Sequence, residues 1–411
     1  MNRSRVLADL VPPAGWEAVP AGAVLTPVTR TGYPDEQLLS VSKYRGVQVR
    51  EDGDSHSRPS EDLSHYLLTM PGDLVVNIML AWDRGLGVTT ERGLVSPAYA
   101  TYTVDEGRVD SRFLDYQVRS EPAVAEWRRR SYGIQPSRWR LYWERMSSAK
   151  LPLPPLDTQR RIADMLDAET ARIDTLIEKN QRVREIALLR ETVAISEVVG
   201  SGGLHVGGYQ TGALRWFDVD IQTGPFGTQL HADEYITGAW PVCNPSNIRD
   251  GRLVADESVT VGDETWERLA RHHLKLGDIV FGRRGEMGRA ALVSDAEVGW
   301  VCGTGCLVVR LRNQNQYLAE FLMEVLSSWG VRAWFDQMSV GSTMQNLNET
   351  VLGSLPVPAV PIDVQRKALE DVRSIRKQHA ALRARVARQQ ELLRLRRQAL
   401  ITAAVTGEIE I

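Results

Sequence analysis

Apolar side chains recur at helical spacing along two long segments of the chain. The first segment follows Asp157 and runs to Gly200 without a helix-breaking residue. Its apolar residues are separated by steps of three, four and seven, which places them on one face of a helix. They are Ile162, Leu166, Ile173, Leu176, Val183 and Ala187. The pattern predicts a single helix that is about 60 Å long, because each helical residue adds about 1.5 Å.

The second segment repeats this pattern after Asp363 and runs to Gly407. Its stripe consists of Leu369, Val372, Ile375, Leu382, Val386, Leu393 and Leu400. An Asp before each helix is a good N-cap, and a Gly after it suits the C′ position. A narrow stripe cannot stabilise so long a helix alone, so we expect the two helices to pack on each other in antiparallel fashion. Asn180, His379 and Gln389 interrupt the stripes, and we interpret them as register devices or partner-facing residues.

A Pro-rich stretch precedes each helix and belongs to a repeat of half the chain. The stretches are 151-LPLPPLDTQRRIADML-166 and 355-LPVPAVPIDVQRKALEDV-372, with the two DxQR signatures 206 positions apart. At nearly the same offset, 71-PGDLV is echoed by 276-LGDIV, and 196-SEVVG by 403-AAVTG. Each half therefore consists of a globular segment, a Pro-rich hinge and a helix, which suggests pseudo-two-fold symmetry. We expect the prolines to end the strand and to fix where the helix begins.

The globular segments have the patterns of short strands and a few helices. The stretches 73-DLVVNIML and 278-DIVFG are rich in Val and Ile and are bounded by Gly or Pro, as strands are. Residues 317–335 have helical spacing, and the equivalent residues 113–129 are interrupted by Pro122. The predicted fold class is α+β, with two mixed α/β domains in a pseudo-two-fold arrangement, separated by two long helices that form an antiparallel coiled coil. The predicted parts are 1–150, 151–200, a Gly-rich linker at 201–213, 214–354 and 355–411.

The composition is that of a soluble protein with several domains. Of 411 residues, 43% are hydrophobic and 25% are charged, and the formal net charge of −3 does not by itself indicate a nucleic-acid binder. No apolar run has the length of a membrane span, and Met1 to Leu10 lacks the core of a signal peptide. Three cysteines favour a reducing cytoplasm over a disulfide framework. We expect Cys243, Cys302 and Cys306 to be buried strand residues rather than metal ligands.

No motif in the sequence predicts catalysis or cofactor binding. GxxxxGK[ST], HExxH and GxSxG are all absent. The stretch 243-CNPSNI-248 is similar to the Asn-Pro-Pro-aromatic motif of DNA amino-methyltransferases, but Ser246 and Asn247 depart from it, and a polar turn between two strands is favoured. The string 283-RRGEMG-288 is too short to predict a dinucleotide loop.

The globular segments do contain loops rich in Arg, Lys, Asn and Gln, the side chains that bind phosphates and base edges of DNA. Solvated turns are the alternative for any single residue, so the interpretation depends on their clustering in both halves. In the first half the candidates are Lys43, Tyr44, Arg45, Arg50, Asn77, Trp82, Arg84, Arg129, Arg130, Gln135 and Arg138. In the second half they are Thr228, Asn244, Asn247, Arg249, Arg283, Arg284, Arg289, Ser342, Gln345 and Asn346.

Over essentially its whole length the chain resembles the specificity subunit of a Type I restriction-modification system. The Leu-Pro-x-Pro hinges with Asp157 and Gln159, or Asp363 and Gln365, are similar to the family's helix starts, although the family often has Glu before the Gln. The stretches 224-GPFGTQL-230, 278-DIVFGRRGEMG-288 and 341-GSTMQNLN-348 resemble recognition-domain signatures. The stretches 77-NIMLAW-82, 96-SPAY-99 and 133-GIQPSRWRL-141 resemble those of a different subclass.

The resemblance implies a non-catalytic subunit that reads an asymmetric, bipartite target in double-stranded DNA. Each recognition domain would read one half-site, and the helices would set the spacer and dock two modification subunits. Those subunits would carry S-adenosylmethionine and methylate adenine at N6, and an ATP- and Mg-dependent restriction and translocase subunit would join them. This chain itself would hold no cofactor and no metal. Two alternatives stay open at this point: a stand-alone DNA modification enzyme, and a coiled-coil adaptor that binds no DNA.

Overall fold

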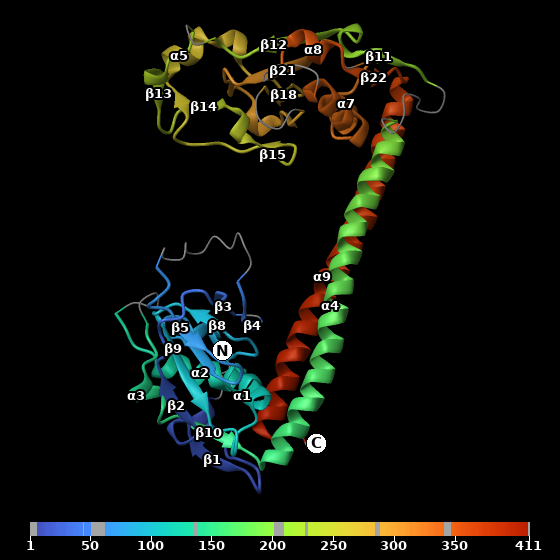
Figure 1. Cartoon of the computed structure of the whole chain (residues 1–411). Helices are drawn as coiled ribbons and strands as arrows, with labels where there is room; N and C mark the ends of the chain where they lie inside the picture. The colour runs from blue at the N-terminus through green and yellow to red at the C-terminus, as the bar shows by residue number, and fades with distance from the viewer. Residues whose placement is uncertain are drawn as a thin grey trace. The chain divides into compact units, whose positions relative to one another are not determined.

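The computed structural model divides the chain into two units (Figure 1). The first consists of Met1–Asn180 and Arg388–Ile411, and the second of Gln181–Ala387. The residues that the structure describes are 6–43, 45–50, 62–134, 139–200, 209–226, 229–283, 288–313, 315–340 and 347–409. Each unit therefore contains a globular part together with a segment of each long helix, α4 (Leu156–Val199) and α9 (Ile362–Thr406).

The first unit is built on a four-stranded antiparallel sheet with the order β2-β9-β6-β7. Its strands are β2 (Leu25–Val28), β9 (Tyr99–Val104), β6 (Leu74–Asn77) and β7 (Leu86–Val88). Two separate antiparallel pairs accompany it: the hairpin of β3 (Leu39–Ser42) with β4 (Gly46–Val49), and β5 (Leu67–Thr69) with β8 (Gly93–Val95). The helices are α1 (Ser111–Val118), α2 (Glu121–Arg130) and α3 (Trp143–Met146), and the short 3-10 turns are η1 (Leu7–Asp9), η2 (Ala21–Ala23) and η3 (Ala81–Asp83).

The second unit repeats this sheet with the order β12-β21-β18-β19. Its strands are β12 (Val219–Thr223), β21 (Cys306–Leu311), β18 (Ile279–Gly282) and β19 (Ala290–Leu292). A second small sheet contains β13 (Tyr235–Ile236), β17 (Thr260–Val261), β14 (Trp240–Cys243) and β20 (Val301–Cys302), and β15 (Ile248–Arg249) pairs with β16 (Arg252–Leu253). The helices are α5 (Asp263–Arg268), α6 (Ala319–Leu326), α7 (Trp329–Val340) and α8 (Glu349–Gly353). The 3-10 turns are η5 (Leu214–Trp216), η6 (Ala232–Glu234), η7 (Pro245–Asn247), η8 (Ala270–His272) and η9 (Asp295–Glu297).

The predicted strands and helices of the globular parts are confirmed at equivalent places. The stretches 73-DLVVNIML and 278-DIVFG contain β6 and β18. Each is preceded by a glycine with positive φ, Gly72 at 91° and Gly277 at 81°, a conformation that glycine adopts at little cost. The helical pattern at 317–335 becomes α6 and most of α7, and the predicted interruption at Pro122 marks the first turn of α2.

A buried aspartate follows each of these glycines and holds the turn before the strand. Asp73 accepts a bond from the Met70 amide at 2.8 Å and pairs with Arg30 at 2.5 Å. Asp278 accepts a bond from the Lys275 amide at 2.7 Å and pairs with Arg310 at 2.6 Å. The hydrogen bonds that Arg310 donates to Asp278 raise the pKa of Arg310. The repeat in the sequence therefore reflects a repeated set of hydrogen bonds and ion pairs at the buried aspartate.

The Pro-rich stretches form strands, which corrects the expectation that their prolines cannot continue a strand. β10 (Lys150–Leu153) contains Pro152 and pairs antiparallel with β1 (Glu17–Pro20). β22 (Pro356–Pro358) pairs with β11 (Thr211–Ala213). Residues 211–213, which were expected to be part of the linker, therefore belong to a strand. Each pair is a two-stranded ribbon, where a proline can sit with its missing N–H away from the partner.

The helix starts differ by one or two residues from the prediction, whereas the ends agree with it. α4 begins at Leu156 and α9 at Ile362, so Asp157 and Asp363 lie in the first turn and are not N-caps. The amides of Gln159 and Gln365 instead bond to the carbonyls of Pro155 and Pro361, at 3.0 and 3.1 Å. Gly200 and Gly407 follow the last helical residues with φ of 75° and 73°, as expected of C′ glycines.

The apolar stripes are confirmed in part. Ile162, Leu166, Ile173 and Ala187 are buried, and so are Leu369, Val372 and Val386. Leu176, Val183 and Leu382 are exposed by more than two fifths, so the expectation that they are covered is wrong. In each unit the end of one helix enters the core of the globular part. Val199 of α4 packs in the second unit, and Ile401, Ala404 and Val405 of α9 pack in the first.

Segments of α4 and α9 lie side by side within each unit (Figure 1). In the first unit Asp174 of α4 accepts a bond from Arg397 Nε of α9 at 3.1 Å, and Gln390 Nε2 reaches the Ile177 carbonyl at 3.5 Å. In the second unit Glu191 of α4 pairs with Arg383 of α9. Residue numbers rise along one helix as they fall along the other in the first unit, so the contacts there have the antiparallel sense that we expected.

Candidate nucleic-acid interface

Three predicted loops of the first unit lie in contact with one another. Lys43 Nζ pairs with Asp83 at 2.9 Å, which joins the loop before β4 to the turn after β6. The ring of Trp82 makes an edge contact with Trp139 at a centroid distance of 5.9 Å, which adds the loop after α2. Arg128 lies over the Trp82 ring at 5.9 Å. The structure thus brings together cationic and aromatic side chains that are far apart in the sequence.

Several first-half candidates have structural partners inside the unit. Asn77 is buried, and its Oδ1 accepts a bond from the Met79 amide at 3.1 Å, which holds the turn after β6. Arg84 has a φ of 64° and pairs with Glu121. Arg129 and Arg130 both pair with Glu126, whose side chain is 1% exposed. The guanidinium groups of Arg129 and Arg130 thus neutralise a buried carboxylate.

Three of the four predicted polar loops of the second unit, 244–249, 282–289 and 341–348, are joined through their described residues near Gly303 and Gly305. The stretch 243-CNPSNI-248 is a polar turn between β14 and β15, as the sequence favoured, and Asn247 closes it by accepting the Asn244 amide at 2.8 Å. Arg289 Nη1 donates to the Pro245 carbonyl at 3.3 Å. A Cβ at Gly305 would lie 2.8 Å from Pro245 Cδ, so this approach requires glycine.

Arg283 joins the third loop to the same place. Its Nε donates to the Leu347 carbonyl at 3.1 Å, and its Nη1 to the Thr304 carbonyl at 3.4 Å. Asn247 is buried and its Nδ2 donates to the Val254 carbonyl at 2.8 Å, so this amide supports the turn. Arg283, Arg289 and Asn247 therefore hold the loops together.

The remaining candidates are placed as follows. Arg45 and Arg249 are exposed, and Arg249 Nε donates to the Ser246 carbonyl at 3.2 Å. Arg50 is half-buried and takes part in further interactions within the first unit. Eight candidates lie outside the described residues: Tyr44, Gln135, Arg138, Thr228, Arg284, Ser342, Gln345 and Asn346.

A buried glutamine attaches each globular part to its long helix. Gln159 Oε1 accepts the Asp110 amide at 2.9 Å, and Nε2 donates to the carbonyls of Arg108 at 3.0 Å and Pro154 at 2.9 Å. Gln365 Oε1 accepts the Leu318 amide at 2.8 Å, and Nε2 donates to the carbonyls of Gln316 and Val360, both at 2.9 Å. Both glutamines belong to the DxQR signatures, in which we predicted the aspartates to be the helix caps. The recurrence of Gln at the same offset was the signal that could have found this clamp.

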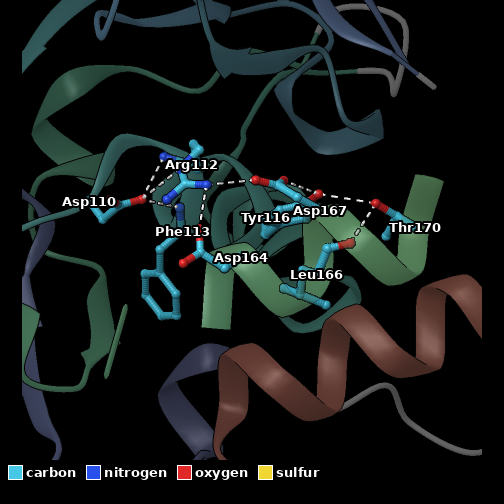
Figure 2. A network of polar contacts seen from close by, with 8 residues as sticks. All are labelled: Asp110, Arg112, Phe113, Tyr116, Asp164, Leu166, Asp167 and Thr170. Carbon is cyan, nitrogen blue, oxygen red and sulfur yellow. Dashed lines mark hydrogen bonds and ion pairs between the residues drawn. The ribbon is translucent and has the colours of Figure 1, made fainter. Parts of the chain in front are cut away.

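Ion pairs surround the clamp of the first unit, where α1 lies against α4 (Figure 2). Asp110 caps α1 by accepting the amides of Arg112 and Phe113, both at 3.1 Å. Arg112 Nη1 donates to Asp164 and to Asp167, each at 2.8 Å. Tyr116 donates its hydroxyl to Asp167 at 2.8 Å, and burial raises the pKa of Tyr116 to about 12, so the hydroxyl stays protonated.

The second unit has ion pairs at the equivalent joint, but their polarity is inverted. Here the globular helix α6 supplies the acids and the long helix α9 supplies the bases. Arg376 forms a two-point pair with Glu324 at 2.6 and 2.7 Å, and Arg373 Nη2 reaches Glu320 at 3.2 Å. No sequence motif predicts these ion pairs, because each joins two residues that are more than 50 positions apart in the chain.

Nothing in the described ranges forms a metal centre. No group of three or more His, Cys, Asp or Glu side chains there could hold an ion. The three cysteines are buried in or next to strands, as predicted, and burial raises the pKa of Cys302 well above its ordinary value. None of the helices that the structure describes is long and apolar enough to cross a bilayer.

Comparison with known proteins confirms the resemblance seen in the sequence. Residues 233–383 match the family model described as "Type I restriction modification DNA specificity domain". The chain is similar in fold to a structure titled "Structural basis underlying complex assembly and conformational transition of the type I R-M system", with 16% identity, a TM-score of 0.70, and coverage of 97% of this chain and 100% of that one. It is also similar to the HsdS subunit from Thermoanaerobacter tengcongensis, with 18% identity, a TM-score of 0.54, and coverage of 97% and 98%. Among curated protein sequences, no match was found.

Proposed function

We propose, on the premise that residues 233–383 are a Type I restriction modification DNA specificity domain, that the whole chain is a non-catalytic DNA-specificity subunit with two recognition domains. The observation that carries this proposal is the repeated strand order. The first unit has the sheet order β2-β9-β6-β7 where the second has β12-β21-β18-β19, and a glutamine clamp joins each to its helix. The same architecture in both units supports the same task for both.

Each recognition domain would read one short half-site of double-stranded DNA. The loop clusters supply the chemistry for this, because Arg and Lys neutralise phosphates and Arg or Asn side chains pair with base edges in the major groove. In the first unit the reading set would come from Lys43, Arg45, Arg50, Trp82 and Arg128, together with predicted residues that lie outside the described ranges. In the second unit it would include Arg249 and Asn244. Since the two loop sets differ in sequence, the two half-sites would differ and the target would be asymmetric.

The long helices would form an antiparallel coiled coil that sets the unread spacer and docks two modification subunits. Exposed apolar side chains on α4 support a docking role, since Leu188 is 57% exposed and Leu189 is 66% exposed. The modification subunits would bring S-adenosylmethionine and methylate adenine, and an ATP-driven, Mg-dependent restriction subunit would complete the assembly. Deletion of one heptad from both helices should then shorten the preferred spacer and leave both half-sites unchanged.

Methylation mapping tests the proposal most simply. Genomic DNA from cells that express the chain with its modification partners is compared with DNA from cells that lack only this chain. We expect the loss of one bipartite, asymmetric adenine mark. An unchanged set of marks, with no salt-sensitive DNA binding by the assembled complex, would refute the proposal, since phosphate contacts make affinity fall with salt.

A further inference from the structure

The two long helices differ in charge, although they are repeats of one another. α9 carries many more Arg and Lys than Asp and Glu, whereas α4 carries slightly more acids than bases. The ion pairs between them follow this difference. Asp174 of α4 pairs with Arg397 of α9 in the first unit, and Glu191 of α4 pairs with Arg383 of α9 in the second. Each of these pairs takes its acid from α4 and its base from α9.

The offset of the repeat shows which positions of the two helices are equivalent. The 206-residue shift that superimposes Gln159 on Gln365 also superimposes Glu191 on Arg397. This pair of equivalent positions therefore carries opposite charges. If α4 paired with the α4 of a second copy in the same register, Asp174 would face Glu191. If α9 paired with another α9, Arg383 would face Arg397.

The joints to the globular parts follow the same rule. The equivalent clamp contacts of Asp110 and Leu318 give a shift of 208 residues for the globular helices, so Arg112 of α1 corresponds to Glu320 of α6. Asp167 of α4 corresponds to Arg373 of α9 by the 206-residue shift. Docking of α6 on α4 would place Glu320 against Asp167. Docking of α1 on α9 would place Arg112 against Arg373, although Glu370, the equivalent of Asp164, would still attract it. The acids of α6 are thus matched in charge to α9 and not to α4, whereas Arg112 of α1 would lose one of its two attractive contacts on α9.

We propose that the charges of α4 and α9 are complementary to each other, and that like charges disfavour the pairing of α4 with α4, or of α9 with α9, between two copies of the chain. The excluded partner is a second copy of this same chain, which would otherwise exchange helices to form a self-paired dimer. Single exposed ion pairs contribute little to stability. Selectivity, however, depends on the difference between an attractive and a repulsive contact, and the self-paired dimer would contain two like-charge contacts between its α4 helices and two between its α9 helices. The inference concerns self-association and goes beyond the proposed reading of DNA.

A charge exchange in the full chain distinguishes selectivity against self-pairing from stabilisation of the native helix pair. The variant Asp174→Arg with Arg397→Asp keeps an attractive pair at the native contact and leaves Glu191 with Arg383. It also makes the contacts between two copies attractive. The new base at position 174 would face Glu191 of the second copy, and the new acid at position 397 would face Arg383 of the second copy. The matched control is Glu169→Arg with Arg172→Glu, which reverses an ion pair within α4 and does not involve α9.

Each protein is unfolded in urea, refolded over a range of concentrations and analysed by sedimentation velocity. We expect native chain and control to stay monomeric, and the exchanged variant to dimerise with an association constant at least about tenfold higher, which is about 1.4 kcal/mol. If the exchanged variant does not refold, Glu191→Arg with Arg383→Glu makes the same test at the other contact. Equal association of native chain, control and variant would overturn the proposal, and so would a native chain that dimerises by exchanging helices.

Discussion

The two joints between globular part and long helix are alike in their backbone contacts and opposite in their charges. Gln159 and Gln365 each bond one amide and two carbonyls at equivalent positions. Around them, Arg112 faces Asp164 and Asp167 in the first unit, whereas acids of α6 face Arg373 and Arg376 in the second. The buried clamp preserves the repeated fold, and the exposed charges distinguish one copy of the repeat from the other.

Removal of the clamp should have the largest effect and a similar one in both units. Gln159→Ala and Gln365→Ala each leave three buried or half-buried backbone groups without partners. We expect each to lower the free energy of unfolding of its unit by about 2–3 kcal/mol, because an unsatisfied buried polar group costs about 1–3 kcal/mol. Urea unfolding of the full chain measures this, with the exposed Gln181→Ala as control. A large loss at one glutamine with none at the other would show that the two clamps are not equivalent.

A second difference between the units predicts a dependence on pH. Glu126 of the first unit is buried where the second unit has Trp334. Burial alone would raise the pKa of Glu126, but hydrogen bonds from Arg129 and Arg130 bring that pKa below its ordinary value of 4.5. The ionised carboxylate therefore stabilises the fold above pH 4.5, and this stabilisation is lost as the pH falls through the lowered pKa.

We expect Glu126→Gln to reduce this acid sensitivity. Urea midpoints of the native chain and the variant, recorded from neutral pH down through the titration of Glu126, should converge as the pH falls. A constant difference between the two proteins over the whole range would show that Glu126 does not contribute through its charge.

The exposed ion pairs of the joints should give the smallest effect. Arg112→Glu places an acid beside Asp164 and Asp167, and we expect it to lower the stability of the first unit by about 0.5–1 kcal/mol, the range of exposed pairs. Addition of Asp167→Arg should recover most of this loss, because the double variant has the polarity of the second unit. The exposed Arg182→Glu on α4 serves as control. The absence of recovery in the double variant, measured by urea unfolding, would argue against the inverted polarity as a pairing rule.

The sequence predicted the features that depend on spacing along the chain. Local periodicity and turn chemistry predict the helix ends at Gly200 and Gly407. They also predict the strands within 73–80 and 278–282 and the polar turn at 243–248. The strands at Pro152 and Pro356 contradict the prediction that proline ends a strand, because a two-stranded ribbon tolerates proline at its edge.

Contacts between residues far apart in the chain could not be predicted from local sequence patterns. The pairing of Trp82 with Trp139, and of Arg289 with the Pro245 carbonyl, depends on how the strands are ordered. Likewise, nothing local distinguishes Arg130, which neutralises buried Glu126, from an arginine that is free to meet a phosphate. Candidate residues could therefore be chosen by type from the sequence, but their roles depend on the partners that the fold gives them.

The most direct measurement replaces one recognition domain and leaves the other unchanged. Residues 14–150 are replaced by the recognition domain of another specificity subunit, and adenine methylation is mapped in cells that supply the modification partners. We predict that one half-site changes, while the other half-site and the spacer length stay as they were. A change in both half-sites, or an unchanged target, would contradict the claim that each unit reads its own half of the DNA sequence.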